Sequence, residues 1–128
     1  MSLLDLFFPR KCPYCLKLIE RGRLECDKCR SEFPKEPYIR TIPSGNECVS
    51  AFMYDSKIRD ALARYKFRGK REFYKSFGAV LANAVAESEI IADMVTSVPL
   101  SKKRLHMRGY NQSELIAREL AKILELDY

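Results

Sequence analysis

Four of the five cysteines fall in two Cys-x-x-Cys pairs, Cys12 with Cys15 and Cys26 with Cys29. This spacing lets two thiolates reach one ion, and four soft anionic ligands in a tetrahedron are the set that zinc prefers. Because four cysteines leave no open position for water, we expect a structural zinc ion rather than a catalytic one. Its binding free energy would substitute for a core too small to fold alone.

Two other interpretations of these cysteines are a pair of disulfides and an iron or iron–sulfur site. Nothing in the sequence indicates export, and cytosolic thiols are kept reduced, so zinc is the preferred interpretation. Ten residues separate the two pairs. We expect them to form a hairpin that runs out over residues 17–19, turns at Arg21 and Gly22, and returns over 23–25. Cys48 is expected as a buried strand residue, and a role as a loose fifth ligand is left open.

A second candidate site follows an apolar run at residues 93–99. Residues 101–108 hold four basic residues and no acid. The candidate phosphate-binding residues are Ser101, Lys102, Lys103, Arg104, Arg108 and Gly109. Guanidinium groups fork onto phosphate oxygens, lysines add point charge, and N–H groups that open the next helix can point at an anion. We interpret the segment as a phosphate or pyrophosphate loop, with a plain basic surface loop as the alternative. His106 is expected as a loop residue near the phosphate rather than a ligand or base.

The positive charge is concentrated rather than spread along the chain. The formal net charge is +6, and residues 56–75 hold eight basic residues against Asp60 and Glu72. This favours a phosphate-bearing partner, with solvated faces as the alternative. Lys66 and Arg68 are the candidates there for substrate or nucleic-acid contact.

The sequence also bears on the compartment. No stretch approaches the roughly 20 apolar residues needed to cross a bilayer, so we expect no membrane insertion. The short apolar start, residues 3–8, lacks the basic lead-in of a signal peptide. We therefore expect a cytoplasmic protein.

The remaining residues predict an α/β fold with a boundary near residue 45. We expect a short apolar turn or helix over 3–8 that ends at Pro9, and an extended linker over 33–45, which is punctuated by prolines and Gly45. Apolar periodicity predicts helices over 56–69, 73–85 and 111–125, a strand over 48–54 and a buried parallel strand over 93–99. Residues 1–45 would then be a zinc-binding module with its linker, and residues 46–128 a second domain.

The segment from Val98 to Ser113 resembles the signature of the ComF family of late-competence proteins. The double Cys-x-x-Cys, the apolar lead-in before Cys12, and the segment from Tyr65 to Gly69 are similar to further family motifs, in the same order. The resemblance implies a zinc-ribbon-like module joined to a domain of the type I phosphoribosyltransferase fold. It also implies a role in DNA uptake during natural competence, alongside a helicase-like partner.

In that fold, the loop after the first core strand grips the pyrophosphate of phosphoribosyl pyrophosphate, and it maps here to Ser101 through Gly109. The implied reaction displaces pyrophosphate from the anomeric carbon by a nucleophile, which these residues do not identify. The fold's acidic pair and Thr-Gly loop, which hold ribose, magnesium and the 5-phosphate, have no counterpart in the 128 residues. We therefore expect only the N-terminal half of the domain, magnesium only if another segment completes it, and no assigned catalytic residue.

The sequence leaves three functions open. The first is an enzyme half, and the second is a module that binds single-stranded DNA. In the second, cations of residues 57–71 would track the phosphodiester backbone while bases stack on Tyr65, Phe67, Phe73 or Tyr74. The third is a structural remnant that holds a helicase or another subunit. An incomplete sheet would leave an exposed edge, so self-association is also expected, as a homodimer or as aggregates.

Overall fold

The structure is a computed structural model that describes residues 6–128. In chain order the elements are α2 (Asp27–Ser31), β1 (Tyr38–Thr41), β2 (Glu47–Ser50), α3 (Ser56–Phe67), the short 3-10 helix η1 (Arg71–Phe73), α4 (Tyr74–Ala86), α5 (Lys102–Arg108) and α6 (Gln112–Ile123). Leu6 and Phe7 are helical just ahead of Pro9, in agreement with the predicted apolar turn. The other apolar residues of that prediction, Leu3 and Leu4, lie outside the described residues.

The three long helices predicted from apolar periodicity are confirmed, and local chemistry sets their ends. The Asp55 carboxylate accepts the Ile58 N–H at 2.8 Å and so opens α3. Gly69, at φ +66°, lets the chain turn away after α3 in the left-handed region that favours glycine. Asn111 opens α6 because its side-chain oxygen accepts the N–H groups of Ser113 and Glu114.

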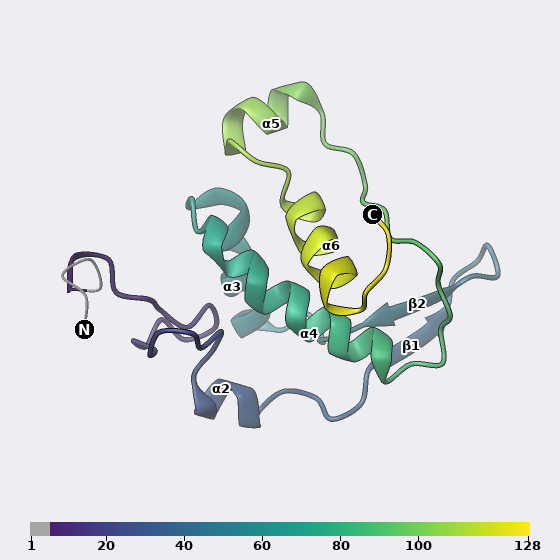
Figure 1. Cartoon of the computed structure of the whole chain (residues 1–128), viewed down its shortest axis with the longest axis horizontal. Helices are drawn as coiled ribbons and strands as arrows, with labels where there is room; N and C mark the ends of the chain where they lie inside the picture. Colours follow the sequence, from purple (N-terminus) through teal and green to yellow (C-terminus); the bar gives the residue numbers. More distant parts are fainter. Residues whose placement is uncertain (1–5) are drawn as a thin grey trace.

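Helices α4 and α6 cross at close range, and Figure 1 shows α6 lying over α4. The contact is tightest at Gly78, where an added Cβ would lie 2.7 Å from the Cβ of Glu119. The core is formed by α3, η1 and α4 together with residues of the N-terminal segment. Its largest fully buried side chain is Tyr65 of α3.

The structure corrects the predicted linker over residues 33–45. Residues of β1 pair antiparallel with β2, in a register that sets Tyr38 opposite Ser50 and Thr41 opposite Glu47. The prolines of this region flank β1, where they do not break its hydrogen-bond ladder. Cys48 lies in β2, as predicted for a strand residue, but it is half-buried rather than buried. The predicted strand over 48–54 is confirmed only in its first part.

The buried parallel strand predicted over 93–99 is wrong for the described residues. The segment makes one parallel bridge, Met94 with Asp127, and the Val95 N–H donates to the Asp127 carbonyl at 2.8 Å. Met94 is 65% exposed and Val98 is 76% exposed. A buried strand needs hydrogen-bonded neighbours on both sides, and residues 6–128 supply only this bridge. The phosphoribosyltransferase-like domain therefore stays a prediction.

Candidate metal centre

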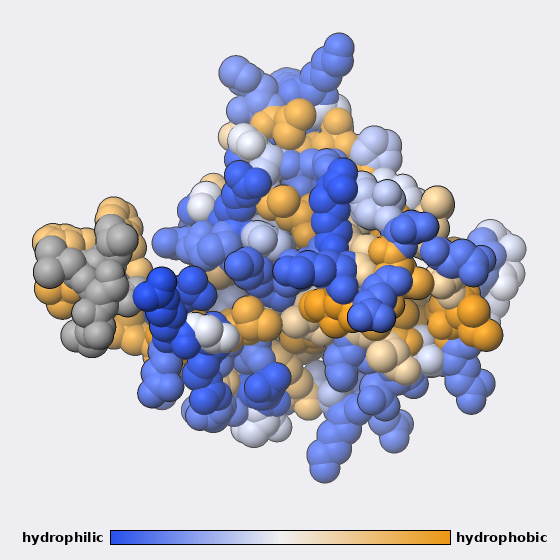
Figure 2. Space-filling model, in the orientation of Figure 1, coloured by the Kyte–Doolittle hydropathy of each residue, from blue (hydrophilic) through white to orange (hydrophobic). Residues whose placement is uncertain are grey.

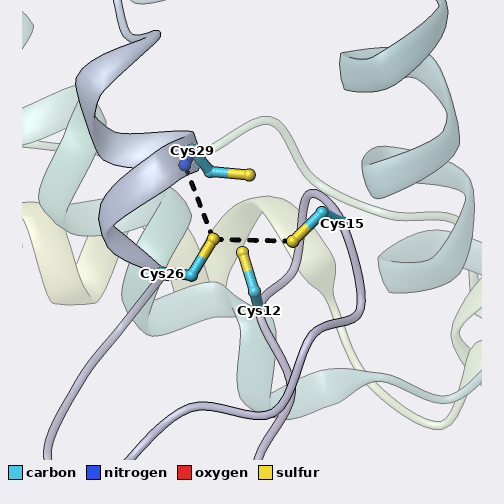
Figure 3. Close-up of side chains that lie close together, drawn as sticks. All are labelled: Cys12, Cys15, Cys26 and Cys29. Atoms are coloured by element: carbon cyan, nitrogen blue, oxygen red, sulfur yellow. Dashed lines mark hydrogen bonds between the residues drawn. The ribbon is translucent and has the colours of Figure 1, made fainter.

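The four predicted zinc ligands come together in one cluster. The sulfurs of Cys12, Cys15, Cys26 and Cys29 all lie within 4.8 Å of one another (Figure 3). Zinc–sulfur bonds of about 2.3 Å in a tetrahedron place the sulfurs about 3.8 Å apart. The Cys15 and Cys26 sulfurs are 3.5 Å apart, so the cluster matches one tetrahedral ion. Cys48 is not part of it.

The first pair is held by a tight turn in the backbone. The Cys12 N–H donates to the Lys17 carbonyl at 2.8 Å, and the Leu16 N–H donates to the Cys12 carbonyl at 2.9 Å. Lys11 pairs antiparallel with Leu18, so the small hairpin spans the first Cys-x-x-Cys pair. The prediction that residues 17–19 pair with 23–25 is therefore wrong, although the turn at Gly22 is present. The tight turn within this hairpin brings the thiolates of Cys12 and Cys15 together.

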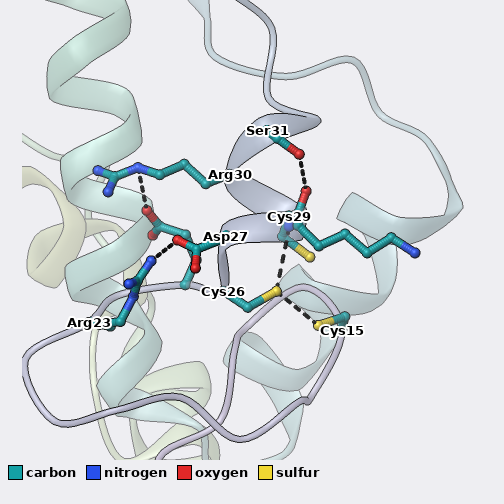
Figure 4. A network of polar contacts seen from close by, with 9 residues as sticks. Cys15, Arg23, Cys26, Asp27, Cys29, Arg30 and Ser31 are labelled. Atoms are coloured by element: carbon teal, nitrogen blue, oxygen red, sulfur yellow. Dashed lines mark hydrogen bonds and ion pairs between the residues drawn. The ribbon is translucent and has the colours of Figure 1, made fainter.

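The second pair lies at the start of α2, where Cys26 caps the helix. The Cys29 N–H points at the Cys26 sulfur at 3.5 Å, and this contact lowers the pKa of Cys26 to about 7. Burial raises the pKa of Cys29 and of Cys15. A bound divalent ion deprotonates coordinating thiols outright, so all four can serve as thiolates. Beside them, Arg23 pairs with Asp27 and closes the loop onto α2 (Figure 4).

The cysteine cluster is packed against the helices rather than standing apart. Cys12, Tyr14 and Cys29 share one buried core with residues of α3 and α4. The Tyr14 ring lies edge-on to Phe77 of α4, with ring centroids 5.8 Å apart. The Arg64 guanidinium of α3 donates to the carbonyl of Pro13 at 2.7 Å. The boundary at residue 45 stays a prediction, because packing is continuous across it.

A buried polar chain also joins the cysteine segment to α4. The Tyr14 and Ser76 hydroxyls are 3.1 Å apart, and the Ser76 hydroxyl donates to Glu25 at 3.0 Å. The other Glu25 oxygen lies 3.3 Å from the Arg30 guanidinium. Sequence reasoning missed these residues. Their signal was a serine on the apolar face of the helix predicted over 73–85, since a buried hydroxyl requires a partner.

The predicted phosphate loop is a short helix in the structure. The Ser101 side chain accepts the Arg104 N–H at 3.3 Å and opens α5, and Gly109, at φ +77°, ends it. In Figure 2, α5 projects at the top of the molecule, with hydrophilic side chains and some exposed hydrophobic ones on its surface. Lys102, Lys103 and Arg104 are exposed, as is His106, so the cations are free to meet a ligand.

Two of the predicted anion-binding groups in this segment are engaged in contacts within the protein. The first-turn N–H groups of α6 that were expected to face an anion are partly taken by the Asn111 side chain. Arg108 is half-buried, with its guanidinium carbon 5.0 Å from the centre of the Phe67 ring. The structure thus places one of the predicted anion-binding arginines against the end of α3.

Some of the basic and aromatic side chains predicted to contact a nucleic acid or substrate are engaged within the protein, and others are exposed. Lys57 pairs with Glu32. Lys66 is half-buried and Arg68 exposed at the end of α3. Among the aromatic residues proposed for base stacking, Tyr65 and Phe73 are buried, and Tyr74 is half-buried. Only Phe67, 69% exposed, presents a large part of its ring to solvent. Base stacking along this segment is therefore restricted.

Comparisons with known proteins support the metal centre and the resemblance. Residues 3–40 match the family described as the double zinc ribbon domain. The chain is 32% identical over 71 residues to competence protein ComFC of Bacillus subtilis (strain 168), a match that covers 53% of this chain and 29% of that relative. No solved structure gives a significant match. The chain is thus similar to part of a ComF-family protein, and its four-cysteine cluster is a structural zinc site.

No helix within residues 6–128 is both long enough and apolar enough to cross a membrane.

Proposed function

We propose that the chain is a ComF-like, phosphoribosyltransferase-related segment whose α5 region binds the pyrophosphate group of phosphoribosyl pyrophosphate. The observation that carries the proposal is the acid-free helix α5, which presents Lys102, Lys103 and Arg104 to solvent between the Ser101 cap and Gly109. The similarity to ComFC supports the same assignment. A cytoplasmic location and a role in competence and DNA uptake are part of this proposal.

The chemistry of these residues suits pyrophosphate as a leaving group. Arginine forks onto phosphate oxygens and lysine adds charge, so both stabilise the negative charge that develops when the bond to the anomeric carbon breaks. Among the described residues, the four cysteines are the only group arranged to hold a metal, and this set suits zinc rather than magnesium. Magnesium binding therefore requires acids supplied by another segment or chain.

Titration of the zinc-loaded chain with pyrophosphate, without magnesium, tests the proposal. Arg104→Ala with Arg108→Ala should abolish binding, because the pair removes both guanidinium groups of α5. The matched control, Arg21→Ala with Arg40→Ala, removes the same charge from exposed positions elsewhere and should leave binding within about twofold. Unchanged binding in the α5 variant would refute the assignment.

A second candidate function is the binding of single-stranded nucleic acid, and one groove favours it. A groove of about 550 Å³ lies between residues 7–11 and the turn that leads into α4. Its lining includes the exposed side chains of Phe7 and Phe8 and the basic residues Arg10, Lys11, Arg23, Lys70 and Lys75. Aromatic rings beside cations are the usual elements of a sequence-tolerant single-strand site.

Fluorescence anisotropy with a labelled oligothymidine tests this second function. Binding should weaken steeply as salt rises, because each neutralised phosphate releases a counterion. Lys70→Ala with Lys75→Ala should reduce the slope of that dependence by about two. A flat salt titration would exclude the nucleic-acid function. A helicase-like partner and a homodimer stay predictions.

A further inference from the structure

Two buried tyrosines form a reciprocal clasp between α3 and the junction of α5 and α6. The Tyr65 hydroxyl donates to the main-chain carbonyl of Gln112 at 2.7 Å, and the Tyr110 hydroxyl donates to the main-chain carbonyl of Tyr65. Their ring centroids are 5.6 Å apart, and both side chains are buried. Each tyrosine therefore satisfies a backbone group on the other segment.

The clasp matters because α5 has little else to hold it. None of its seven residues is buried, so packing on the core does not fix its orientation. Figure 1 shows α5 apart from the body, joined to it by the segments at its two ends. At its C-terminal end Tyr110 is anchored to α3, and the Arg108 guanidinium lies over the Phe67 ring. These contacts set where the arginines of α5 lie.

The same contacts bring cations of two segments together. Phe67, whose ring Arg108 covers, stands between Lys66 and Arg68 at the end of α3. Burial raises the pKa of the Tyr110 phenol, and the nearby charges act on it in both directions: Glu72 raises it further, whereas Arg108 and Arg71, from η1, lower it. Arg71 of η1 and Arg108 of α5 thus lie near the clasp together with one acid, Glu72. Two arginines against one acid leave an excess of positive charge beside the clasp, and this excess favours an anionic ligand.

We propose that Tyr65 and Tyr110 are positioning residues that join Lys66 and Arg68 of α3 to Arg104 and Arg108 of α5 as one pyrophosphate site. The inference rests on the proposed function, since it specifies how the same site is assembled. The tyrosines do not touch the ligand. They hold the two cationic segments in the spacing that lets both reach one pyrophosphate group, which lowers the cost of ordering them on binding.

Removing one hydroxyl tests the clasp without removing a ring or a charge. Tyr110→Phe should weaken pyrophosphate binding roughly tenfold, the size expected when an element must be ordered by the ligand instead of by its own hydrogen bond. Tyr65→Phe should weaken it to a similar degree. Tyr54→Phe, at an exposed tyrosine ahead of α3, is the matched control and should leave affinity unchanged. All titrations are made at least 15 °C below each variant's melting temperature.

A cycle of substitutions separates positioning from general loss of stability. In the unaltered chain, Arg68→Ala should weaken binding about tenfold, because a hydrogen-bonded charge is lost. In the Tyr110→Phe background, Arg68→Ala should add little, because the two segments no longer reach the ligand together. Arg104→Ala should keep its effect in both backgrounds.

The outcomes distinguish the two levels of the proposal. Absence of pyrophosphate binding in the unaltered chain would overturn the proposed function itself. Binding that depends on Arg104 but is unchanged in Tyr110→Phe and Tyr65→Phe would leave the proposed function standing and overturn the clasp. Equal effects of Arg68→Ala in both backgrounds would also overturn it.

Discussion

Removal of the zinc ion should unfold far more than the segment that binds it. Structural zinc contributes roughly 10–16 kcal/mol in small zinc-finger peptides at pH 7, whereas a whole domain is stable by about 5–15 kcal/mol. Here Cys12, Tyr14 and Cys29 are buried in the core shared with α3 and α4. Loss of the ion leaves the thiols without their common ligand inside that core. The helices that share the core should therefore lose stability as well.

The size of the effect follows from the lengths of the helices. Local unfolding of the cysteine segment would remove α2, which has 5 residues, whereas spread of unfolding through the shared core would also remove α3 and α4, with 12 and 13 residues. We therefore expect a strong zinc chelator to eliminate more than half of the helical circular dichroism signal at 222 nm. A reductant is kept present, because the Cys15 and Cys26 sulfurs lie 3.5 Å apart and could oxidise once released.

The control is the same chelator saturated with zinc beforehand, which should leave the signal unchanged. Stoichiometric metal in the starting material is verified by elemental analysis. A loss no larger than that of α2, with an unchanged melting temperature for the rest, would show that the cysteine segment is an independent unit. That result would refute the argument from the shared core.

Two further predictions concern the helices that support the candidate sites. Gly78→Ala gains about 1 kcal/mol of helix propensity, but its Cβ would lie 2.7 Å from that of Glu119. Since overpacking costs about 1–3 kcal/mol, the variant should be less stable by about 1 kcal/mol in urea denaturation, with Asn83→Ala on the exposed side of α4 as control. A more stable Gly78→Ala protein would contradict the close contact. Burial raises the pKa of Tyr65, so the stability it contributes is complete below the unfolded value of about 10 and is lost as the pH rises above it. Tyr65→Phe should therefore flatten the decline of the urea midpoint above about pH 10. An unchanged slope there would show that ionisation of Tyr65 does not cause the decline.

Much of the fold was readable from local patterns. The helices α3, α4 and α6 follow from apolar residues spaced by three or four, and Asp55 and Asn111 mark two of their starts. The strand predicted over 93–99 failed because an apolar run specifies that a segment can be buried, not what covers it. Residues 6–128 give this segment one backbone bridge, to Asp127, and Met94 and Val98 remain largely exposed.

The sequence by itself determined the zinc ligands, because a Cys-x-x-Cys pair brings two sulfurs together through a turn of four residues. Only the tertiary structure decided that this centre shares its core with α3 and α4, and that Tyr65 and Tyr110 bind each other's segments. The physical reason is the range of the interactions. A turn depends on neighbours in the chain, whereas a buried hydroxyl or ring finds partners that lie 45 residues away or more.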